Sequence, residues 1–449
     1  MSFPNVEEHH HLHHPPPYVA AMYASIFPFE LYDEVIGYVD IDHLSKLSLV
    51  NTYFRFRTQA ILFKDIRIVA GPLCILRSTE TTVGDEKKQG RILPDTFQEV
   101  LTRFEELSLD ALNHVRSVTL GGLSSSEKLT NGHGLDLHLN ICMVKKFLSR
   151  LRHVETLQIH DILWSPCMKQ LLDLNNHNCV PESVVFPLKA LSLSHVAHSR
   201  SSDTIFNIFD IAGRCEELLL NHISWRNTPP FGLSVRTPRQ DVQRLVVRFP
   251  DSFSLAHQLM LRFPILTGLT YLEVHNVAEE SYDALWNLLE QNSSTLEELK
   301  LNVDSTSFSV DSWIELPTFT CSQLREVSIT LDLCNHKAND GCAGTETLEA
   351  FLQTLSESVE VLHVAVMDSA MHEESVRRFR SLLDWSAIIA QLKTLPRLKN
   401  VDFIIVNIDD MNESDSVQLT WENNVQKDLR PINVVFSTIS NRNYTPGLI

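Results

Sequence analysis

Apolar positions recur along most of the chain in one pattern. An apolar residue is followed by a second three positions later and by a third two positions after that. The pattern occurs at Val115-Val118-Leu120, Val154-Leu157-Ile159, Leu188-Leu191-Leu193, Cys215-Leu218-Leu220, Val242-Leu245-Val247, Leu269-Leu272-Val274, Leu296-Leu299-Leu301, Leu324-Val327-Ile329, Val359-Leu362-Val364 and Leu398-Val401-Phe403. Successive first members are 39, 34, 27, 27, 27, 27, 28, 35 and 39 residues apart. A nearly constant step in the high twenties predicts a solenoid, whose repeats complete their cores by stacking.

The end of each pattern alternates between apolar and polar residues, as in a strand with one buried face. The segments between the patterns instead place apolar residues three and four positions apart, which is typical of helices. Two examples are Tyr282, Leu285, Leu288 and Leu289, and Leu348, Phe351, Leu352 and Leu355. The sequence therefore predicts an α/β solenoid over residues 97–410, in which a curved parallel sheet carries helices on its outer face.

The segment from Phe27 to Phe63 has a different character. Phe27, Leu31, Val35 and Val39 lie four positions apart and predict a helix with one apolar stripe. Asp40 and Asp42 are suited to cap a second short helix, and a third follows. Three such short helices bury little surface by themselves, so we expect part of the apolar stripe to remain available for a partner.

The remaining segments lack these patterns. Residues 1–22 combine five histidines with four prolines and predict a disordered tail, although the histidines also allow metal binding. Residues 69–96 are polar and predict a connector. Residues 411–449 contain no clear repeat, and their alternating apolar positions predict a closing cap or a tail.

The N-terminal segment resembles the F-box, with residues 23–68 as its extent. The resemblance rests on Phe27-Pro28-Phe29-Glu30-Leu31, Val35-Ile36, Tyr38-Val39-Asp40, Leu44, Leu47, Val50-Asn51 and Phe54, with Phe27 where leucine is commoner. F-box proteins bind a Skp-type adaptor and, through it, the cullin of a ubiquitin ligase.

Carried over by position, the resemblance implies residues that contact the adaptor or support the contact: Pro28, Leu31, Val35, Ile36 and Leu44. It implies that Val39, Leu47, Val50 and Phe54 hold the three helices together. The alternative is that the apolar stripe packs against the chain's own array.

The array resembles the irregular leucine-rich repeats that follow the F-box in many fungal F-box proteins. It departs from their pattern at the ninth repeat position, where an asparagine is expected and where this chain has Ile162, Val196, Ile223, Pro250, Val277, Asp304 and Asp332. This departure allows either an asparagine-poor variant with apolar filling or a more open, twisted stack.

In repeats of this type the third, fifth and seventh positions face away from the core, on the inner curve of the sheet. In the central repeats these positions include an arginine–aromatic group with apolar neighbours, which suits a protein-binding hot spot. The candidate client-binding residues are Leu219, Arg244, Val246, Arg248, Tyr271 and His275. Four glutamates on the same face oppose its few basic residues, which favours unmodified or basic clients over phosphorylated ones.

Composition narrows the partner classes. Thirty-eight basic and 56 acidic residues give a net charge of −18, which argues against a nucleic-acid partner. No apolar stretch has the length of a membrane span. Eight scattered cysteines without a leader predict reduced thiols and therefore a location in the cytoplasm, the nucleus or both.

The sequence contains no motif for catalysis, a cofactor or a metal. His372-Glu373-Glu374 lacks the second histidine of a zinc-protease helix, and Cys334, His336 and Cys342 lack a fourth ligand. We therefore expect a non-catalytic substrate-recognition subunit of a Skp–cullin–F-box ubiquitin ligase, without cofactors. The alternatives are an adaptor-bound scaffold that passes no client for degradation and, from another class, an enzyme hidden in the array.

Overall fold

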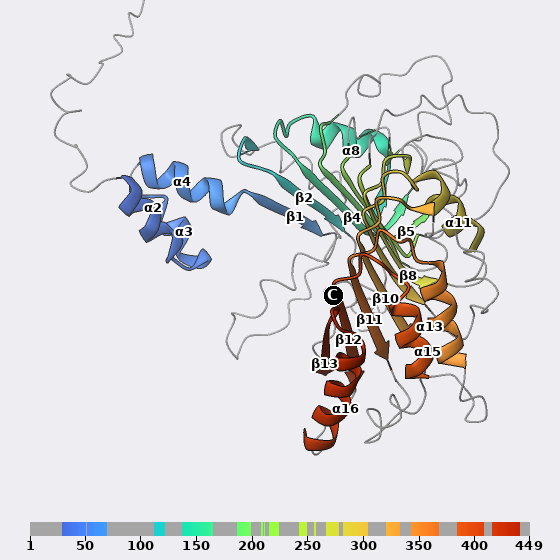
Figure 1. Cartoon of the computed structure of the whole chain (residues 1–449). Helices are drawn as coiled ribbons and strands as arrows, with labels where there is room; N and C mark the ends of the chain where they lie inside the picture. Colours follow the sequence, from blue (N-terminus) through green and yellow to red (C-terminus); the bar gives the residue numbers. More distant parts are fainter. Residues whose placement is uncertain are drawn as a thin grey trace, which may run out of the picture. The chain divides into compact units, whose positions relative to one another are not determined.

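A computed structural model describes residues 29–50, 52–69, 112–121, 137–164, 186–198, 208–209, 211, 215–223, 242–248, 256, 266–277, 282–303, 320–332, 343–367, 384–407 and 415–440 (Figure 1). The chain divides into two compact units between Asp65 and Ile66. The predicted boundary of the helical segment, residue 68, lies close to this division. The predicted tail and all of the predicted connector after Val69 lie outside the described residues.

The described part of the first unit consists of helices α2 (Phe29–Gly37), α3 (Ile41–Leu47) and α4 (Thr52–Leu62). Ile36, Leu44 and Phe54 come from the three different helices and form a small buried core. Val39, Leu47 and Leu62 pack against that core from the side. The unit therefore has an interior of its own, although a small one.

The described residues of the second unit form one sheet of thirteen strands: β1 (Asp65–Val69), β2 (Ser117–Gly121), β3 (Leu137–Leu139), β4 (Thr156–Trp164), β5 (Ala190–His198), β6 (Glu217–Asn221), β7 (Arg244–Arg248), β8 (Tyr271–Val277), β9 (Glu298–Val303), β10 (Glu326–Asp332), β11 (Val361–Met367), β12 (Asn400–Asn407) and β13 (Asn433–Ser440). Apart from β3, each strand lies beside the preceding one in chain order. From β2 to β13 the pairing is parallel. The predicted α/β architecture is confirmed, and the arrangement is solenoid-like.

The register of the sheet explains the sequence pattern. Leu218 pairs with Leu245, and Leu245 pairs with Leu272, so equivalent repeat positions form continuous rows across the strands. Every residue of the ten apolar patterns is buried. Each repeat thus covers the apolar side of its neighbour, which a single repeat is too small to do.

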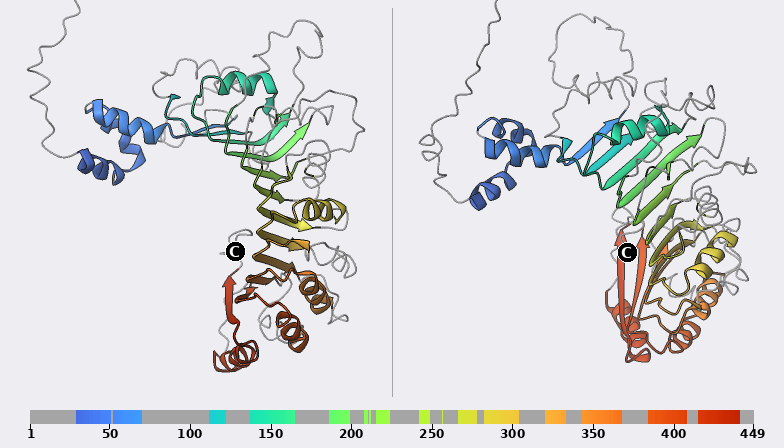
Figure 2. Two further views of the ribbon diagram at one scale, coloured as in Figure 1. Left: turned by 45° about the horizontal axis from the view of Figure 1, so that its top comes forward. Right: turned by 90° about the horizontal axis from the view of Figure 1, so that it is seen from above.

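Helices α8 (Ile141–Leu148), α11 (Tyr282–Gln291), α13 (Ala343–Thr354), α15 (Trp385–Leu392) and α16 (Asp415–Asp428) connect strands of the sheet. Figure 2 shows α11, α13 and α15 along one face of the sheet. Leu285, Leu288 and Leu289 of α11 are buried, as their spacing predicts. The third, fifth and seventh repeat positions therefore lie on the opposite face, where the strands alternate between buried and more exposed residues.

Two parts of the sheet go beyond the sequence pattern. The segment assigned to a cap or tail contributes α16 and a final strand, β13, which pairs in register with β12. Its pattern was hidden because Pro431 stands where the preceding repeat has Leu398. The short strand β3 pairs with an extension of β4 that ends at the buried Trp164.

The ninth repeat positions Ile162, Val196, Ile223 and Val277 are buried, so apolar side chains fill this row where the structure describes it. The preceding residues in three successive repeats, Asp161, His195 and His222, have positive φ values of 52°, 50° and 50°. The backbone is left-handed at the same position of these three repeats, although none of the three residues is glycine. Each such residue costs on the order of 1–3 kcal/mol of conformational strain.

Candidate functional site

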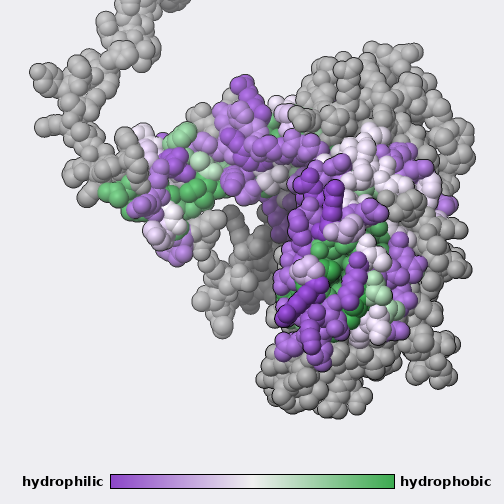
Figure 3. Space-filling view, in the orientation of Figure 1, coloured by the Kyte–Doolittle hydropathy of each residue, from purple (hydrophilic) through white to green (hydrophobic). Residues whose placement is uncertain are grey.

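The helical unit carries exposed apolar side chains on α2. Leu31 and Val35 lie four positions apart on this helix and are 44% and 52% exposed. Residues at this spacing lie on the same side of a helix. Leu49, Val50, Phe56 and Ile61 add further exposed apolar surface, and Figure 3 shows apolar side chains on this unit. The unit thus combines a closed interior with an apolar surface suited to a protein partner.

The structure separates the predicted adaptor residues into two groups. Leu31 and Val35 are exposed, but Ile36 and Leu44 are each only 3% exposed and belong to the core of the unit. Adjacent helical residues such as Val35 and Ile36 point about 100° apart, so one faces outward while the other is buried. Ile36 and Leu44 therefore support the surface and do not form it. Pro28 lies outside the described residues.

The predicted internal residues also divide. Val39, Leu47 and Phe54 belong to the core or pack against it. Val50, in contrast, is 63% exposed, so its assignment to the helix core is wrong. It follows α3 in the turn before α4, where the chain is free to direct the side chain outward.

A polar contact joins the first and third helices of this unit. Arg57 donates to both carboxylate oxygens of Asp33, at 2.7 Å from Nε and 2.5 Å from Nη2. Tyr53 Oη donates to the same carboxylate at 2.8 Å. These hydrogen bonds from Arg57 and Tyr53 hold the pKa of Asp33 below its ordinary value.

The second candidate surface is the sheet face opposite the helices. The guanidinium of Arg244 lies 3.8 Å from the centroid of the Tyr271 ring, a cation–π contact between neighbouring strands. Arg248 Nη2 lies 3.7 Å from Glu273 Oε1. Leu219 and Val246 are half-buried beside this group. The structure thus brings together the six residues predicted to bind a client, although Tyr271 and His275 are only 5% and 7% exposed.

Glu273 is the centre of this group, whereas the sequence pattern indicates it only as one of the four glutamates on this face. Tyr271 donates to its Oε2, and His275 Nε2 lies 2.5 Å from its Oε1. Burial would raise the pKa of Glu273, but the hydrogen bonds of His275 and Tyr271 and the charge of Arg248 lower it below the ordinary value. Burial, and then the contact with Glu273, raise the pKa of Tyr271. Tyr271, Glu273 and His275 stand at every second position of β8 and therefore lie on one face of the sheet. This spacing is the feature of the sequence that indicates the group.

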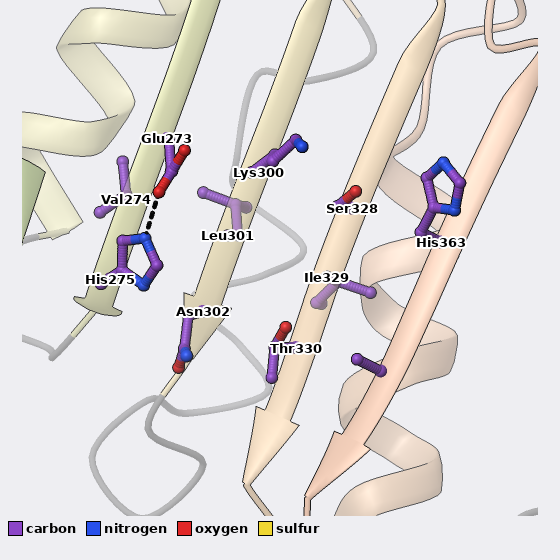
Figure 4. Close-up of a pocket in the computed structure, with 11 residues that line it drawn as sticks. Glu273, Val274, His275, Lys300, Leu301, Asn302, Ser328, Ile329, Thr330 and His363 are labelled. Carbon is purple, nitrogen blue, oxygen red and sulfur yellow. Dashed lines mark hydrogen bonds and ion pairs between the residues drawn. The ribbon is translucent and has the colours of Figure 1, made fainter. Parts of the chain in front are cut away.

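Beside this group the sheet face forms a hollow over β8 to β11 (Figure 4). Its polar lining comes from the fifth and seventh repeat positions: Glu273, His275, Lys300, Asn302, Ser328, Thr330 and His363. Lys300, Ser328 and His363 pair in register on three neighbouring strands. Lys300 Nζ lies 3.3 Å from Glu298, and His363 Nδ1 lies 2.9 Å from Asp402.

Ser328, in the middle of this row, is 7% exposed, and its hydroxyl oxygen makes no hydrogen bond. Ser328, His363 and Asp402 are the residue types of a hydrolytic triad on adjacent strands. A triad requires the imidazole to accept the serine proton, and this contact is not formed between Ser328 and His363. Among the described residues, Ser328 Oγ therefore has no base within hydrogen-bonding distance.

The described residues contain no group of three side chains able to hold a metal ion. Cys334, His336, Cys342 and His372 lie outside the part that the structure describes. None of the helices in the described part combines the length and apolar character needed to cross a membrane. No family model matches this chain, and no curated protein matches it.

Proposed function

We propose that this chain is the substrate-recognition subunit of a ubiquitin ligase of the Skp–cullin–F-box type. The helical unit docks on a Skp-type adaptor, and the sheet unit holds a protein client in the cytoplasm or the nucleus. The observation that carries the proposal is the outward position of Leu31 and Val35 on a helical unit whose interior is already closed by Ile36, Leu44 and Phe54.

The size of the helical core supports the docking role. Among the described residues of this unit, three apolar side chains form the buried centre, which is a small interior. Burying an exposed leucine or valine against a partner contributes on the order of 1.5–3 kcal/mol. Docking through α2 would therefore add a contribution comparable to that of the internal core residues.

The sheet unit supports the client-binding role in a different way. Its described strands place side chains from successive repeats in continuous rows, and the central rows combine Arg244, Tyr271 and Arg248 with half-buried apolar neighbours. Arginine and tyrosine are the residue types that most often dominate protein interfaces. Tethering a client beside a ubiquitin-charged enzyme raises its effective concentration, so the chain itself need perform no chemistry.

Affinity capture with proteasome activity blocked tests this proposal. The full-length chain is expressed as wild type, as Leu31→Asp and as the control Val435→Asp, which alters a side chain of matched exposure on the sheet unit. We expect all three forms to capture the same partners of the sheet unit. Without proteasome inhibition, the cellular abundance of these partners should fall when wild type or Val435→Asp is expressed, but not when Leu31→Asp is expressed.

Partners whose abundance is the same with wild type and Leu31→Asp would contradict a role in degradation. If the wild-type chain binds the adaptor and this result is still obtained, the adaptor-bound scaffold is favoured.

A further inference from the structure

The hollow over β8 to β11 contains a buried hydroxyl that the folded chain does not use. Ser328 lies at the centre of the row Lys300–Ser328–His363, and its Oγ is shielded from solvent without a hydrogen-bond partner. Leaving a buried polar group unsatisfied costs about 1–3 kcal/mol. Alanine would fit the same position in the sheet without this cost. The hydroxyl therefore gains a role if a bound group supplies its missing partner.

The charges around Ser328 select the kind of group. Glu273 is the acidic residue of the lining, and it already accepts from Tyr271 and His275 and lies near Arg248. The lining also contains hydrogen-bond donors: the ammonium of Lys300, which pairs with Glu298, the amide of Asn302, the hydroxyls of Ser328 and Thr330, and the imidazole of His363, which pairs with Asp402. An acceptor with negative charge forms charge-assisted hydrogen bonds with these donors. Lys300 Nζ lies 3.3 Å from Glu298 Oε1, so a bound carboxylate would share this ammonium with Glu298.

We propose that this hollow is a subsite that receives one carboxylate of the client. The inference rests on the proposed function, in which this sheet face binds a protein. The carboxylate accepts from Ser328 and Lys300, so the unsatisfied hydroxyl becomes paired on binding. An acidic side chain and a free C-terminus supply the same group.

The edge of the hollow adds a preference for the neighbours of this carboxylate. Glu298 and Glu326 stand two residues before Lys300 and Ser328 on the same strands, and the side chain of Glu326 is 39% exposed. A basic residue next to the bound carboxylate would face these two acids. The subsite thus takes an acidic group within a basic segment, which is consistent with the basic clients expected from the overall charge of this face.

Selection from random peptide libraries tests the proposal. One library presents peptides with a free C-terminus, and the other joins them to the display particle through the C-terminus, so that only side chains supply carboxylates. The full-length chain in complex with its adaptor is the target. If an acidic side chain supplies the carboxylate, peptides selected from both libraries should share an aspartate or glutamate at one position. If the C-terminus supplies it, peptides should be selected from the free-terminus library alone.

Two variants then connect binding to the hollow. Lys300→Met and Ser328→Ala are each expected to weaken binding of a selected peptide by about tenfold, the effect of losing one hydrogen bond to a charged group. Ser328→Ala should melt no lower than wild type, because its hydroxyl has no partner in the free chain. Ser192→Ala, at the same repeat position on β5, and Lys189→Met, which removes an exposed lysine paired with Glu155, should leave binding unchanged.

Several results would overturn this inference. They are a failure to select any peptide, selected peptides without a carboxylate, and unchanged binding by Lys300→Met. A lower melting temperature of Ser328→Ala would show that the hydroxyl stabilises the fold, and tighter binding after phosphoserine replaces the acidic residue would assign the site to phosphate. The proposed function fails separately, if Leu31→Asp still captures the adaptor while the hollow binds peptides as expected.

Discussion

Arg57 and Asp33 form a two-pronged ion pair that joins α4 to α2, with donor–acceptor distances of 2.7 Å and 2.5 Å. The two residues are 24 positions apart in the chain, and both side chains are more than a third exposed. The planar guanidinium matches both carboxylate oxygens, so the contact fixes the relative orientation of the two helices. It lies on the helix that also presents Leu31 and Val35, and thereby supports the proposed adaptor surface.

This ion pair should make the helical unit sensitive to acid. The pKa of Asp33 is lower in the folded chain than its ordinary value of 3.8, so its contribution is complete above that value and is lost as the pH falls through the folded pKa. Asp33→Asn should reduce amide-exchange protection of α2 and α4 at pH 6. The difference from wild type should shrink below pH 4. A difference that is absent at pH 6, or is undiminished at low pH, would contradict this assignment.

Leu272 lies at the centre of the sheet core and is fully buried. Leu272→Ala should lower the free energy of unfolding by about 2–5 kcal/mol, because it removes buried methyl groups and leaves a cavity. The exposed Gln158, at a fifth repeat position on β4, provides the control, and Gln158→Ala should change the value by less than about 0.5 kcal/mol. Denaturant titration measures both variants, and equal midpoints for them would refute the stacked-core description.

Glu273 should stabilise the inner face through its contacts with Tyr271 and His275. Glu273→Gln keeps the shape but removes the charge, and we expect a loss of about 1–3 kcal/mol at neutral pH. Because the folded pKa of Glu273 is lowered, this loss should diminish as the pH falls through that pKa. Thermal melts at several pH values test this, with Glu217→Gln, an exposed partner of Arg244, as the control. Equal effects of the two substitutions would argue against a central role for Glu273.

Two buried cysteines report on opening of the array. Burial raises the pKa of the Cys215 thiol to about 12 and that of Cys321 to about 11, so neither is a reactive thiolate at pH 8. Mass spectrometry after treatment with iodoacetamide should find both unmodified in the folded protein and modified as denaturant unfolds the sheet. Rapid modification without denaturant would show that these repeats open readily.

The repeat spacing predicted the sheet because the same three residues of each repeat must be buried in every layer. Residue spacing gave less information on the final strand, where Pro431 interrupts the pattern although β13 still pairs in register with β12. Backbone pairing tolerates a substitution at one core position, whereas a sequence pattern does not. The strand β13 is therefore identified only from its pairing with β12 in the structure.

The candidate sites were harder to predict. Sequence spacing identified the apolar stripe of α2 but did not separate outward Val35 from inward Ile36, because that depends on where α3 and α4 pack. On the sheet, the repeat positions predict the arginine–tyrosine group. They do not predict the hollow around Ser328, because it depends on which neighbouring side chains satisfy one another across four strands.

Titration of a purified Skp-type adaptor against the full-length chain tests the central claim most directly. Wild type and Val435→Asp should bind the adaptor with the same affinity. Leu31→Asp should show no measurable binding while its circular dichroism and the unfolding midpoint of its sheet remain those of wild type. Adaptor binding by Leu31→Asp at wild-type affinity would contradict the account.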